Sequence, residues 1–369
     1  MTGLQVAAGC DVGTFSLDVE MTARDGEVVA VIGPNGSGKS TLLRAVAGLQ
    51  PLSRGTIRLG DRTLDDAGAG VFVPARERRV GMVFSDVRLF PSMTALDNVA
   101  FGLRARGVAN RAARAAAAQW LERLGIGDLG RRRREQLSGG QAQRVAIARA
   151  LACEPDVLLL DEPLAALDVA TRSEVQTALS AHVASFGGPT LLVTHDPLEA
   201  VLLASRIVVL ERGRVVQAGT PVEVTNRPAT PYVARVVGVN LWSGRSDGPA
   251  VVLDDGGVLV VADAPPGRVL VSAAPSSFTL HAAAPGGSSA RNGWDARVES
   301  LAVVGDAASG LVRARLTGPP SVAVDLTPAA VAELDLAPGR RVWVTAKATA
   351  LSAYPAPDEI PTRGVGPLP

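Results

Sequence analysis

The chain has 369 residues, enough for two domains, and its 47% hydrophobic and 20% charged residues are typical of a protein that buries a core. A net charge of +1 excludes a general attraction to nucleic acid or to anionic lipid. We recognise neither an apolar run long enough to span a bilayer nor the pattern of a signal peptide. The two cysteines, Cys10 and Cys153, lie far apart, which argues against a disulfide framework and fits a reducing cytosol.

Lysine is almost absent from this chain. Of the 37 basic residues, only Lys39 and Lys347 are lysines, and the other 35 are arginines. In a chain that uses arginine at almost every basic position, a lysine indicates a site where a guanidinium group cannot take its place. Both lysines lie in short motifs, one in each half of the chain.

Residues 1 to about 225 alternate between strand-like and helix-like segments. Strand-like apolar runs occur at 28–32, 80–84, 157–160, 191–193 and 207–210. Helical periodicity occurs at 41–48, 112–124 and 141–152. Strands that alternate with helices indicate an α/β domain with a mostly parallel core sheet, which we place at residues 1–230.

The composition changes at residues 226–231, which read NRPATP. Short strand-like runs follow at 250–253, 258–261, 269–272, 311–316, 322–326 and 342–345. They predict a small all-β domain, a sandwich or a barrel, at residues 238–354, with a linker at 282–289 inside it. Five prolines after Tyr354 predict a disordered tail at 355–369.

The sequence GPNGSGKST follows a predicted strand and precedes a predicted helix. In this setting the pattern G-x-x-x-x-G-K-[ST] predicts a phosphate-binding loop. Its glycines let backbone N–H groups surround phosphate oxygens, Lys39 reaches the β and γ phosphates, and Ser40 holds Mg²⁺. A glycine-rich turn with a chance lysine is the alternative. The predicted nucleotide-binding residues of this loop are Gly33, Pro34, Asn35, Gly36, Ser37, Gly38, Lys39, Ser40 and Thr41.

A second motif, VLLLDE, occupies residues 157–162. Its apolar strand delivers Asp161 to the carboxyl end, where ligands of parallel sheets bind. We expect Asp161 to hold Mg²⁺ directly or through water, and Glu162 to polarise the attacking water as a general base. An acidic pair that caps a helix is the alternative, and the phosphate loop argues against it.

A third motif, LSGGQ, opens the helix predicted at 141–152. A hydroxyl, two unobstructed N–H groups and a helix dipole together make a second anion-binding site. Its residues are Ser138, Gly139, Gly140 and Gln141. Because the phosphate loop already supplies one such site, the second implies a second phosphate group or the nucleotide of a second subunit.

The order of phosphate loop, LSGGQ, VLLLDE and a later histidine resembles the ATP-binding cassette (ABC) family over residues 1–225. The resemblance implies a parallel sheet with an inserted helical subdomain, ATP and Mg²⁺ as ligands, and a head-to-tail homodimer. In such a dimer Ser138 of one subunit faces the γ phosphate held by Lys39 of the other, and Asp168 reaches across the interface. His195, in LLVTHD, matches the catalytic histidine that contacts the γ phosphate; a strand-end histidine that caps a turn is the alternative, and the other motifs argue against it.

Other positions leave alternatives open. Phe15 lies where the family often stacks an aromatic ring on adenine, and a core phenylalanine is the alternative. Ser85 stands where the family has a glutamine that contacts Mg²⁺ and links to the membrane partner. Serine reaches less far, so its metal contact passes through water or Asp86 contributes. The arginine run at 131–134 is a solvated face or pairs with acidic neighbours, since no aromatic residues accompany it as in a nucleic-acid site.

Two short motifs lie in the predicted all-β domain: SARN at 289–292 and KAT at 347–349. They resemble motifs of the OB-like oxyanion-binding module of molybdate-binding proteins. The resemblance implies a regulatory domain that binds a tetrahedral oxyanion through hydroxyls, backbone N–H groups and a lysine. The residues carried over are Ser289, Arg291, Lys347 and Thr349. A structural β-barrel used only for dimerisation is the alternative.

Residues 74–91 resemble the molybdate-importer ATPases of the ABC family more than the sugar-importer type. The resemblance implies an ATP-hydrolysing subunit that powers molybdate uptake through a separate membrane permease, which an extracytoplasmic substrate-binding protein supplies. Such a subunit is a homodimer, peripheral to the cytoplasmic face of the cell membrane, and has no nucleic-acid partner. The alternatives are the same machine for sulfate, thiosulfate, tungstate or ferric iron, a soluble cassette ATPase acting on ribosomes or DNA, and an oxyanion-storage protein, which would not need Glu162.

Overall fold

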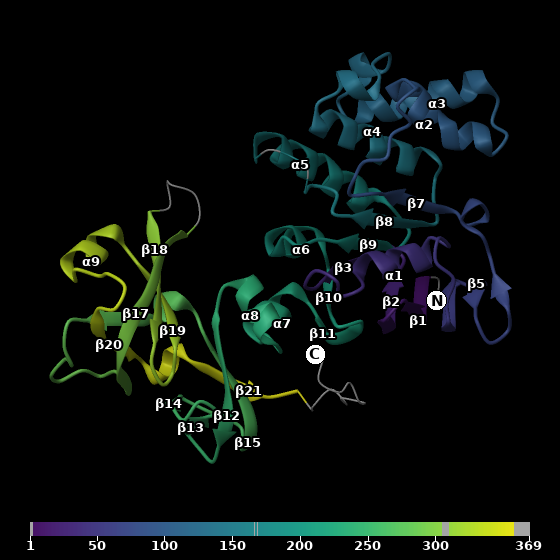
Figure 1. Ribbon diagram of the computed structural model, residues 1–369. Coiled ribbons are helices and arrows are strands. Elements are labelled where there is room, and N and C mark those ends of the chain that lie inside the picture. Colours follow the sequence, from purple (N-terminus) through teal and green to yellow (C-terminus); the bar gives the residue numbers. More distant parts are fainter. Residues whose placement is uncertain (1–2, 166, 168, 305–309, 358–369) are drawn as a thin grey trace. The chain divides into compact units, whose positions relative to one another are not determined.

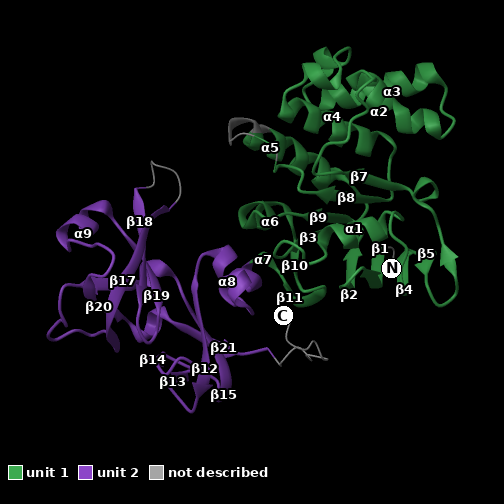
Figure 2. Cartoon of the chain, viewed as in Figure 1, with its two compact units in different colours: residues 1–221 green, residues 222–369 purple. Residues whose placement is uncertain are grey.

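A computed structural model describes residues 3–165, 167, 169–304 and 310–357. The contacts of the chain divide it into two compact units, Met1–Pro221 and Val222–Pro369 (Figure 2). The first unit is the α/β part and the second is the all-β part. The tail predicted to be disordered lies outside the described residues from position 358 onward.

An 11-stranded mixed sheet forms the centre of the first unit (Figure 1). Its strands are β1 (Gly3–Val12), β2 (Phe15–Arg24), β3 (Val28–Ile32), β4 (Arg54–Leu59), β5 (Arg62–Asp66), β6 (Val71–Phe72), β7 (Val80–Val83), β8 (Val157–Asp161), β9 (Thr190–Val193), β10 (Arg206–Glu211) and β11 (Arg214–Gly219). Their order across the sheet is β6-β5-β4-β1-β2-β11-β10-β3-β9-β8-β7. The core strands β10, β3, β9, β8 and β7 are parallel, as predicted.

The other half of the sheet is antiparallel, and the sequence reading did not identify it. Strands β1, β2, β4, β5 and β6 pair antiparallel with one another. In β2 buried and exposed residues alternate, whereas β8 and β9 are buried along their whole length. A sheet that faces solvent on one side produces such alternation, and a strand covered on both faces reads as a continuous apolar run.

The helices of the first unit are α1 (Lys39–Val46), α2 (Ala95–Ala105), α3 (Asn110–Arg123), α4 (Gly139–Ala152), α5 (Val169–Ser185) and α6 (Pro197–Leu203). Helices α2, α3 and α4 lie between β7 and β8 in the chain and form the inserted helical subdomain that was predicted (Figure 1). They bury Val99, Ala117, Leu121 and Val145 in one hydrophobic cluster. The apolar stripes of the three helices therefore face one another, as amphipathic helices require.

One buried arginine ties the antiparallel half of the sheet to α1. The Arg78 guanidinium has no exposed surface and donates hydrogen bonds to the carbonyls of Ala45 and Val46, at the last turn of α1. It also bonds the Leu64 carbonyl and lies 3.4 Å from the buried Asp65 carboxylate. Burial raises the pKa of Asp65, and the Arg78 charge opposes that rise.

Arg78→Ala is expected to lower the free energy of unfolding by about 3–5 kcal/mol, because it leaves the buried Asp65 carboxylate without its ion-pair partner. Arg76→Ala is the matched control: its side chain is 81% exposed and its ion pair with Glu77 contributes less than about 1 kcal/mol. Urea unfolding of the two variants measures the difference. Equal midpoints would show that Arg78 does not stabilise the fold.

The second unit contains two five-stranded sheets around one hydrophobic core. One sheet has the order β14-β13-β12-β15-β21 and the other β16-β20-β17-β18-β19. The strands are β12 (Asn240–Ser246), β13 (Ala250–Leu253), β14 (Val258–Val260), β15 (Gly267–Ala273), β16 (Phe278–His281), β17 (Asn292–Val304), β18 (Leu311–Thr317), β19 (Val322–Leu326), β20 (Arg341–Ala346) and β21 (Ser352–Pro355). Short helices α7 (Pro221–Asn226), α8 (Pro231–Val237) and α9 (Pro328–Glu333) accompany them.

The predicted linker at 282–289 does not separate the two sheets. The chain before it contributes β16 to the second sheet, and the chain after it returns β21 to the first. The core includes Val269 and Val271 of one sheet and Val324 and Val344 of the other. Because each sheet needs strands from both sides of the linker, the unit is one body with one core.

Candidate functional site

Four neighbouring strands end at the same edge of the first unit's sheet, and the predicted site residues follow them. Strand β3 leads into the loop 33–38, β9 into His195, β8 ends on Asp161, and β7 leads into Ser85. These strands are adjacent in the order β3-β9-β8-β7 and run parallel. The carboxyl edge of a parallel sheet is where such proteins bind ligands.

The loop at 33–38 needs glycine for two different physical reasons. Gly36 and Gly38 have φ angles of 78° and 103°, in the region that side chains disfavour. A Cβ on Gly33 would lie 2.1 Å from the Leu210 carbonyl oxygen, so no other residue fits there. The loop then enters α1, whose N-terminus is a ready site for an anion. Ser37 Oγ is buried there with no hydrogen-bond partner among the described atoms.

Lys39 is buried and folds back over the loop. Its Nζ donates to the carbonyl oxygens of Gly33 at 2.7 Å and Pro34 at 3.0 Å. Burial lowers the pKa of the Lys39 ammonium, while the nearby carboxylates of Glu162 and Asp161 oppose that change. Two of the three ammonium donors are thus engaged by the loop's own carbonyls, and the charge stays at the edge of the sheet.

Ser40 and Asp161 face each other across the site. Ser40 Oγ lies 3.5 Å from Asp161 Oδ1, and Asp161 is 9% exposed. Burial raises the pKa of Asp161, and the neighbouring Glu162 charge raises it further. A hydroxyl and a partly desolvated carboxylate are oxygen donors of the kind a hard divalent cation prefers, so this pair fits Mg²⁺.

Glu162 adopts a strained backbone conformation, with φ of 48°. Its N–H donates to the Val193 carbonyl at 2.9 Å, so the neighbouring strand β9 holds this turn in place. Glu162 Oε2 lies 3.4 Å from Nδ1 of His195, whose side chain is 59% exposed. The structure therefore brings Glu162 and His195, two of the three predicted catalytic residues, together beside the loop that holds the third, Lys39.

The LSGGQ motif forms the start of α4, two residues earlier than predicted. Ser138 is the N-cap: its Oγ accepts from the Gln141 N–H, and the Gln141 side chain accepts from the Ser138 N–H. The Ser138 hydroxyl still has its own proton to donate. Since Ser138 and Gly139 are exposed, this helix start can meet an anion supplied from outside the chain.

Other predicted residues lie at the edges of the site. A Cβ on Gly38 would be 2.8 Å from the Phe15 ring, so Phe15 packs against the phosphate loop and the core, half-buried. Ser85 is exposed in the turn after β7, and Asp86 beside it is paired with Arg88. Asp168 lies outside the described residues.

The sequence reading missed the residue that holds the Ser85 turn. Val87 and Arg88 both have positive φ angles, 62° and 42°, which is an unusual conformation for a β-branched residue. Arg149 of α4 donates to their carbonyls at 3.2 and 2.6 Å. In an arginine-rich chain nothing in the sequence distinguishes Arg149 from its many neighbours. The helix that begins at Ser138 thereby braces the segment that contains Ser85.

The two motifs of the C-terminal unit meet at one end of a strand pair. Asn292 of β17 pairs with Ala346 of β20, which puts Arg291 and Lys347 at the next positions. The candidate oxyanion residues Ser289, Arg291, Lys347 and Thr349 are all exposed. Asn292, which was not predicted, is buried and bonds the N–H and C=O of Val260, joining the two sheets.

A phosphate loop after β3, a histidine after the adjacent strand β9, an acidic pair at the end of β8 and a capped LSGGQ helix together define a nucleotide-binding ATPase cassette. Residues 17–165 match the ABC transporter family, and residues 288–353 match the TOBE domain. The chain belongs to the ABC transporter family and is an ATP-hydrolysing subunit of the import type.

Relatives extend over both units of the chain. It is 41% identical, over 93% of its length and 95% of theirs, to the molybdenum import ATP-binding protein ModC of Mycobacterium tuberculosis. It is 45% identical to the Fe(3+) ions import ATP-binding protein FbpC of Streptomyces coelicolor, over 71% of this chain and 74% of that one. A sulfate/thiosulfate import ATP-binding protein, CysA 2 of Rhizobium meliloti, is 46% identical over 60% of each.

The chain is also similar to a solved structure. The ATP-binding cassette MJ0796, in a dimeric post-hydrolysis state bound to ADP and phosphate, is similar with a TM-score of 0.51 and 30% identity. The similarity covers 60% of this chain and 99% of that one.

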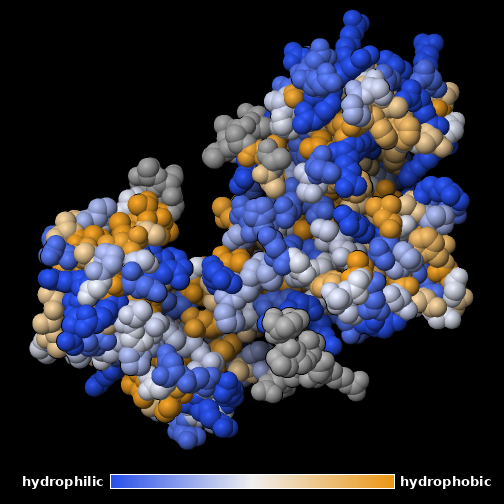
Figure 3. Space-filling view, viewed as in Figure 1, coloured by the Kyte–Doolittle hydropathy of each residue, from blue (hydrophilic) through white to orange (hydrophobic). Residues whose placement is uncertain are grey.

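The visible surface mixes hydrophilic and hydrophobic residues (Figure 3). Among the described residues, no helix has the length and apolar character needed to span a membrane.

Lys39→Ala is expected to lower the affinity for ATP about a hundredfold, because charge-assisted hydrogen bonds to the phosphates are lost. Lys347→Ala removes the chain's other lysine and serves as the matched control, with ATP affinity unchanged. Equilibrium binding of a fluorescent ATP analogue measures both. Equal affinities in the two variants would contradict the role of Lys39.

Proposed function

We propose that this chain is the ATPase subunit of a molybdate importer. It works as a homodimer on the cytoplasmic face of the membrane, bound to a separate permease that receives molybdate from an extracytoplasmic binding protein. The observation that carries the proposal is the set of functional groups at one sheet edge, combined with similarity to molybdenum import proteins along nearly the whole chain. Tungstate, sulfate, thiosulfate and ferric iron remain the alternative cargoes.

ATP hydrolysis follows from the groups at the carboxyl edge. The loop amides and Lys39 bind the phosphates, and Lys39 exchanges its loop carbonyls for phosphate oxygens. Glu162 accepts the proton of the attacking water as general base. His195, 3.4 Å from Glu162, contacts the γ phosphate and orients it for attack.

Ser40 and Asp161 would hold Mg²⁺, with Ser85 reaching it through water. The metal, when bound, neutralises charge on the phosphate oxygens. Ser40 and Asp161 already face each other, and the raised pKa of Asp161 reflects a buried carboxylate that a cation would stabilise. The chain's contribution is to keep both oxygen donors at the edge of the sheet before ATP arrives.

Glu162→Gln is expected to preserve ATP binding and to slow hydrolysis by roughly 10²–10⁴-fold, the usual contribution of a positioned general base. It also traps an ATP-bound dimer, because the closed state cannot discharge its nucleotide. Glu154→Gln, another acidic residue with positive φ, is the control and leaves turnover unchanged. Near-normal turnover in Glu162→Gln would contradict the assignment.

The second anion site supports a composite active site. Ser138 caps α4, which comes from the helical subdomain, and exchanges hydrogen bonds with Gln141, whereas Lys39 bonds the carbonyls of its own loop. In a head-to-tail dimer each Ser138 donates its free hydroxyl proton to the γ phosphate bound by the partner. Asp168, outside the described residues, would contact the opposite subunit.

A preformed apolar surface supports permease docking. Phe90 and Phe101 are 38% and 39% exposed, and their rings lie 4.6 Å apart. Buried Asn98 of α2 donates to the carbonyls of Phe90, Met93 and Thr94 and accepts from the Phe90 N–H. Exposed aromatic side chains on a rigid support are typical of an interface.

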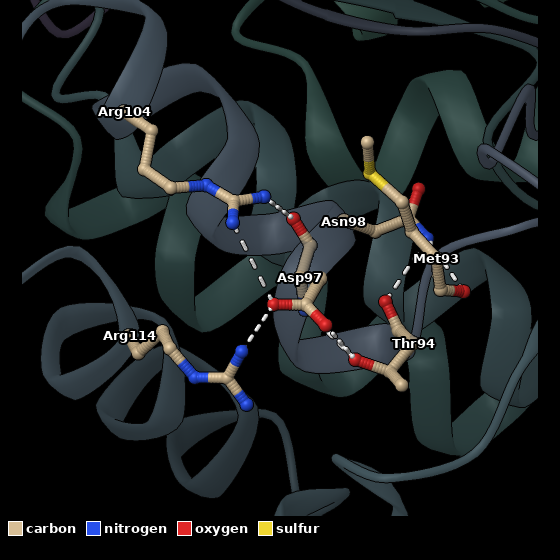
Figure 4. A network of polar contacts seen from close by, with 6 residues as sticks. All are labelled: Met93, Thr94, Asp97, Asn98, Arg104 and Arg114. Carbon is tan, nitrogen blue, oxygen red and sulfur yellow. Dashed lines mark hydrogen bonds and ion pairs between the residues drawn. The ribbon is translucent and has the colours of Figure 1, made fainter. Parts of the chain in front are cut away.

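The same helix is anchored by charge (Figure 4). Asp97 accepts from the Thr94 hydroxyl at 2.7 Å and from Arg114 of α3 at 2.5 Å. Arg104 donates to the Asp97 backbone carbonyl at 3.3 Å. Asn98 thus connects the Phe90 segment to α2, and the Asp97–Arg114 ion pair connects α2 to α3. These connections support a role for this subdomain in coupling.

The C-terminal unit supports an oxyanion sensor. The pairing of β17 with β20 sets Arg291 beside Lys347, so two positive side chains start from adjacent backbone positions. Ser289 and Thr349 supply hydroxyls from the flanking motifs. Bound molybdate would favour the dimer arrangement for which its affinity is higher, and could shift the equilibrium only by that difference.

Lys347→Ala and Arg291→Ala are expected to lower the molybdate affinity of the full-length chain about tenfold to a hundredfold, because each removes a charge-assisted hydrogen bond. Arg297→Ala changes an exposed arginine of β17, the strand that begins directly after Arg291, and is the control. Calorimetric titration with molybdate, tungstate and sulfate measures affinity and selectivity. Absence of molybdate binding by the unaltered chain would leave this unit with a structural role only.

A further inference from the structure

The turn between β9 and α6 and the first turn of α6 contain two buried polar side chains besides the exposed His195. Thr194 is 1% exposed and Glu199 is 5% exposed. Both lie within five residues of each other in the chain, on either side of His195. Buried polar groups cost stability unless they are paired, so their contacts indicate what they do.

A short chain of hydrogen bonds connects Glu199 to the backbone on both sides of His195. The Thr194 hydroxyl donates to Glu199 Oε2 at 2.5 Å and accepts from the Asp196 N–H at 3.0 Å. Asp196 in turn caps α6, with its Oδ1 accepting from the Leu198 N–H at 2.9 Å. The residue before His195 and the residue after it are therefore held by one carboxyl group.

Glu199 also borders the reaction site. It lines a cavity of ≈ 150 Å³ together with Glu162, Thr194 and His195. Its second oxygen, Oε1, is buried without a hydrogen-bond partner among the described atoms. Burial raises the pKa of Glu199, and the Thr194 hydrogen bond opposes the rise. An apolar residue here would avoid this cost, so packing alone does not account for a glutamate.

We propose that Glu199 is a positioning residue that holds the His195 imidazole toward the γ phosphate by fixing the Thr194–Asp196 turn through the Thr194 hydroxyl. This inference rests on the proposed role of His195. The proposed role of Glu199 acts through the turn and requires no contact between its carboxyl group and ATP. An exposed imidazole on a loose turn would lose orientation, and misplacement of a reacting group lowers the rate of the chemical step.

Removal of the carboxyl group should therefore act on turnover rather than on nucleotide affinity. For Glu199→Ala we expect kcat for MgATP to fall about tenfold while KM changes less than about twofold. Thr194→Val removes the connecting hydroxyl and should have the same effect. Glu199→Gln keeps an acceptor oxygen, and Thr194→Ser keeps the hydroxyl, so both should retain most of the turnover.

The decisive experiment is a double-mutant cycle on the full-length chain, measured by steady-state ATPase activity. In a His195→Ala background Glu199→Ala should lower kcat no further, because its effect passes through the imidazole. Leu202→Ala, a 61% exposed residue of the same helix, is the control for general damage to α6. Thermal unfolding of each variant identifies a loss of fold, and Thr194→Val and Glu199→Gln continue the test if Glu199→Ala does not fold.

The outcomes separate two failures. If His195→Ala leaves kcat unchanged, the proposed role of His195 is wrong. If His195→Ala lowers kcat but Glu199→Ala does not, or lowers it equally in both backgrounds, His195 keeps its role and the positioning by Glu199 is refuted. A fall in kcat that disappears in the His195→Ala background supports the inference.

Discussion

The parallel pairing of β3, β9, β8 and β7 is the constraint on which the rest of the structure depends. Parallel strands that lie side by side end at one edge, and each of these four is followed directly by a functional segment. Residues separated by more than 150 positions, such as Lys39 and His195, thereby reach the same site. A one-residue change in the pairing register of any of these strands would displace the functional residue that follows it. The same change would turn the side chains of that strand to the other face of the sheet.

This edge concentrates charge that the interior would otherwise exclude. Lys39 and Asp161 are both buried. Burial lowers the pKa of Lys39 and raises the pKa of Asp161, so it favours the neutral form of each group. Their mutual attraction limits that change, and ATP with its metal would add the missing partners. Glu162 keeps its position through a backbone hydrogen bond to β9 despite a strained φ. Strain and desolvation at one place are consistent with a site organised for a charged substrate.

The helical subdomain supports two loop segments through polar side chains, the half-buried Arg149 and the buried Asn98. Arg149 braces the Ser85 turn from the helix that begins at Ser138, and Asn98 holds the segment around Phe90. Both side chains bond backbone carbonyls, so they define the path of the loop independently of its own side chains. Because neither residue bonds the Ser85 side chain in the described part of the chain, the support of the loop does not depend on the side chain at position 85.

The sequence by itself predicted the phosphate loop, the buried strand that ends in Asp161 and the LSGGQ helix start at Ser138. Each of these motifs depends only on residues that are close together in the chain. The parallel core strands and their helices were predicted for the same reason. Only the tertiary structure shows the antiparallel half of the sheet, the contribution of strands from both sides of residues 282–289 to each C-terminal sheet, and the contacts of Arg149, Asn292 and Glu199. Those features depend on partners distant in the chain or on burial, and neither pattern nor composition contains that information.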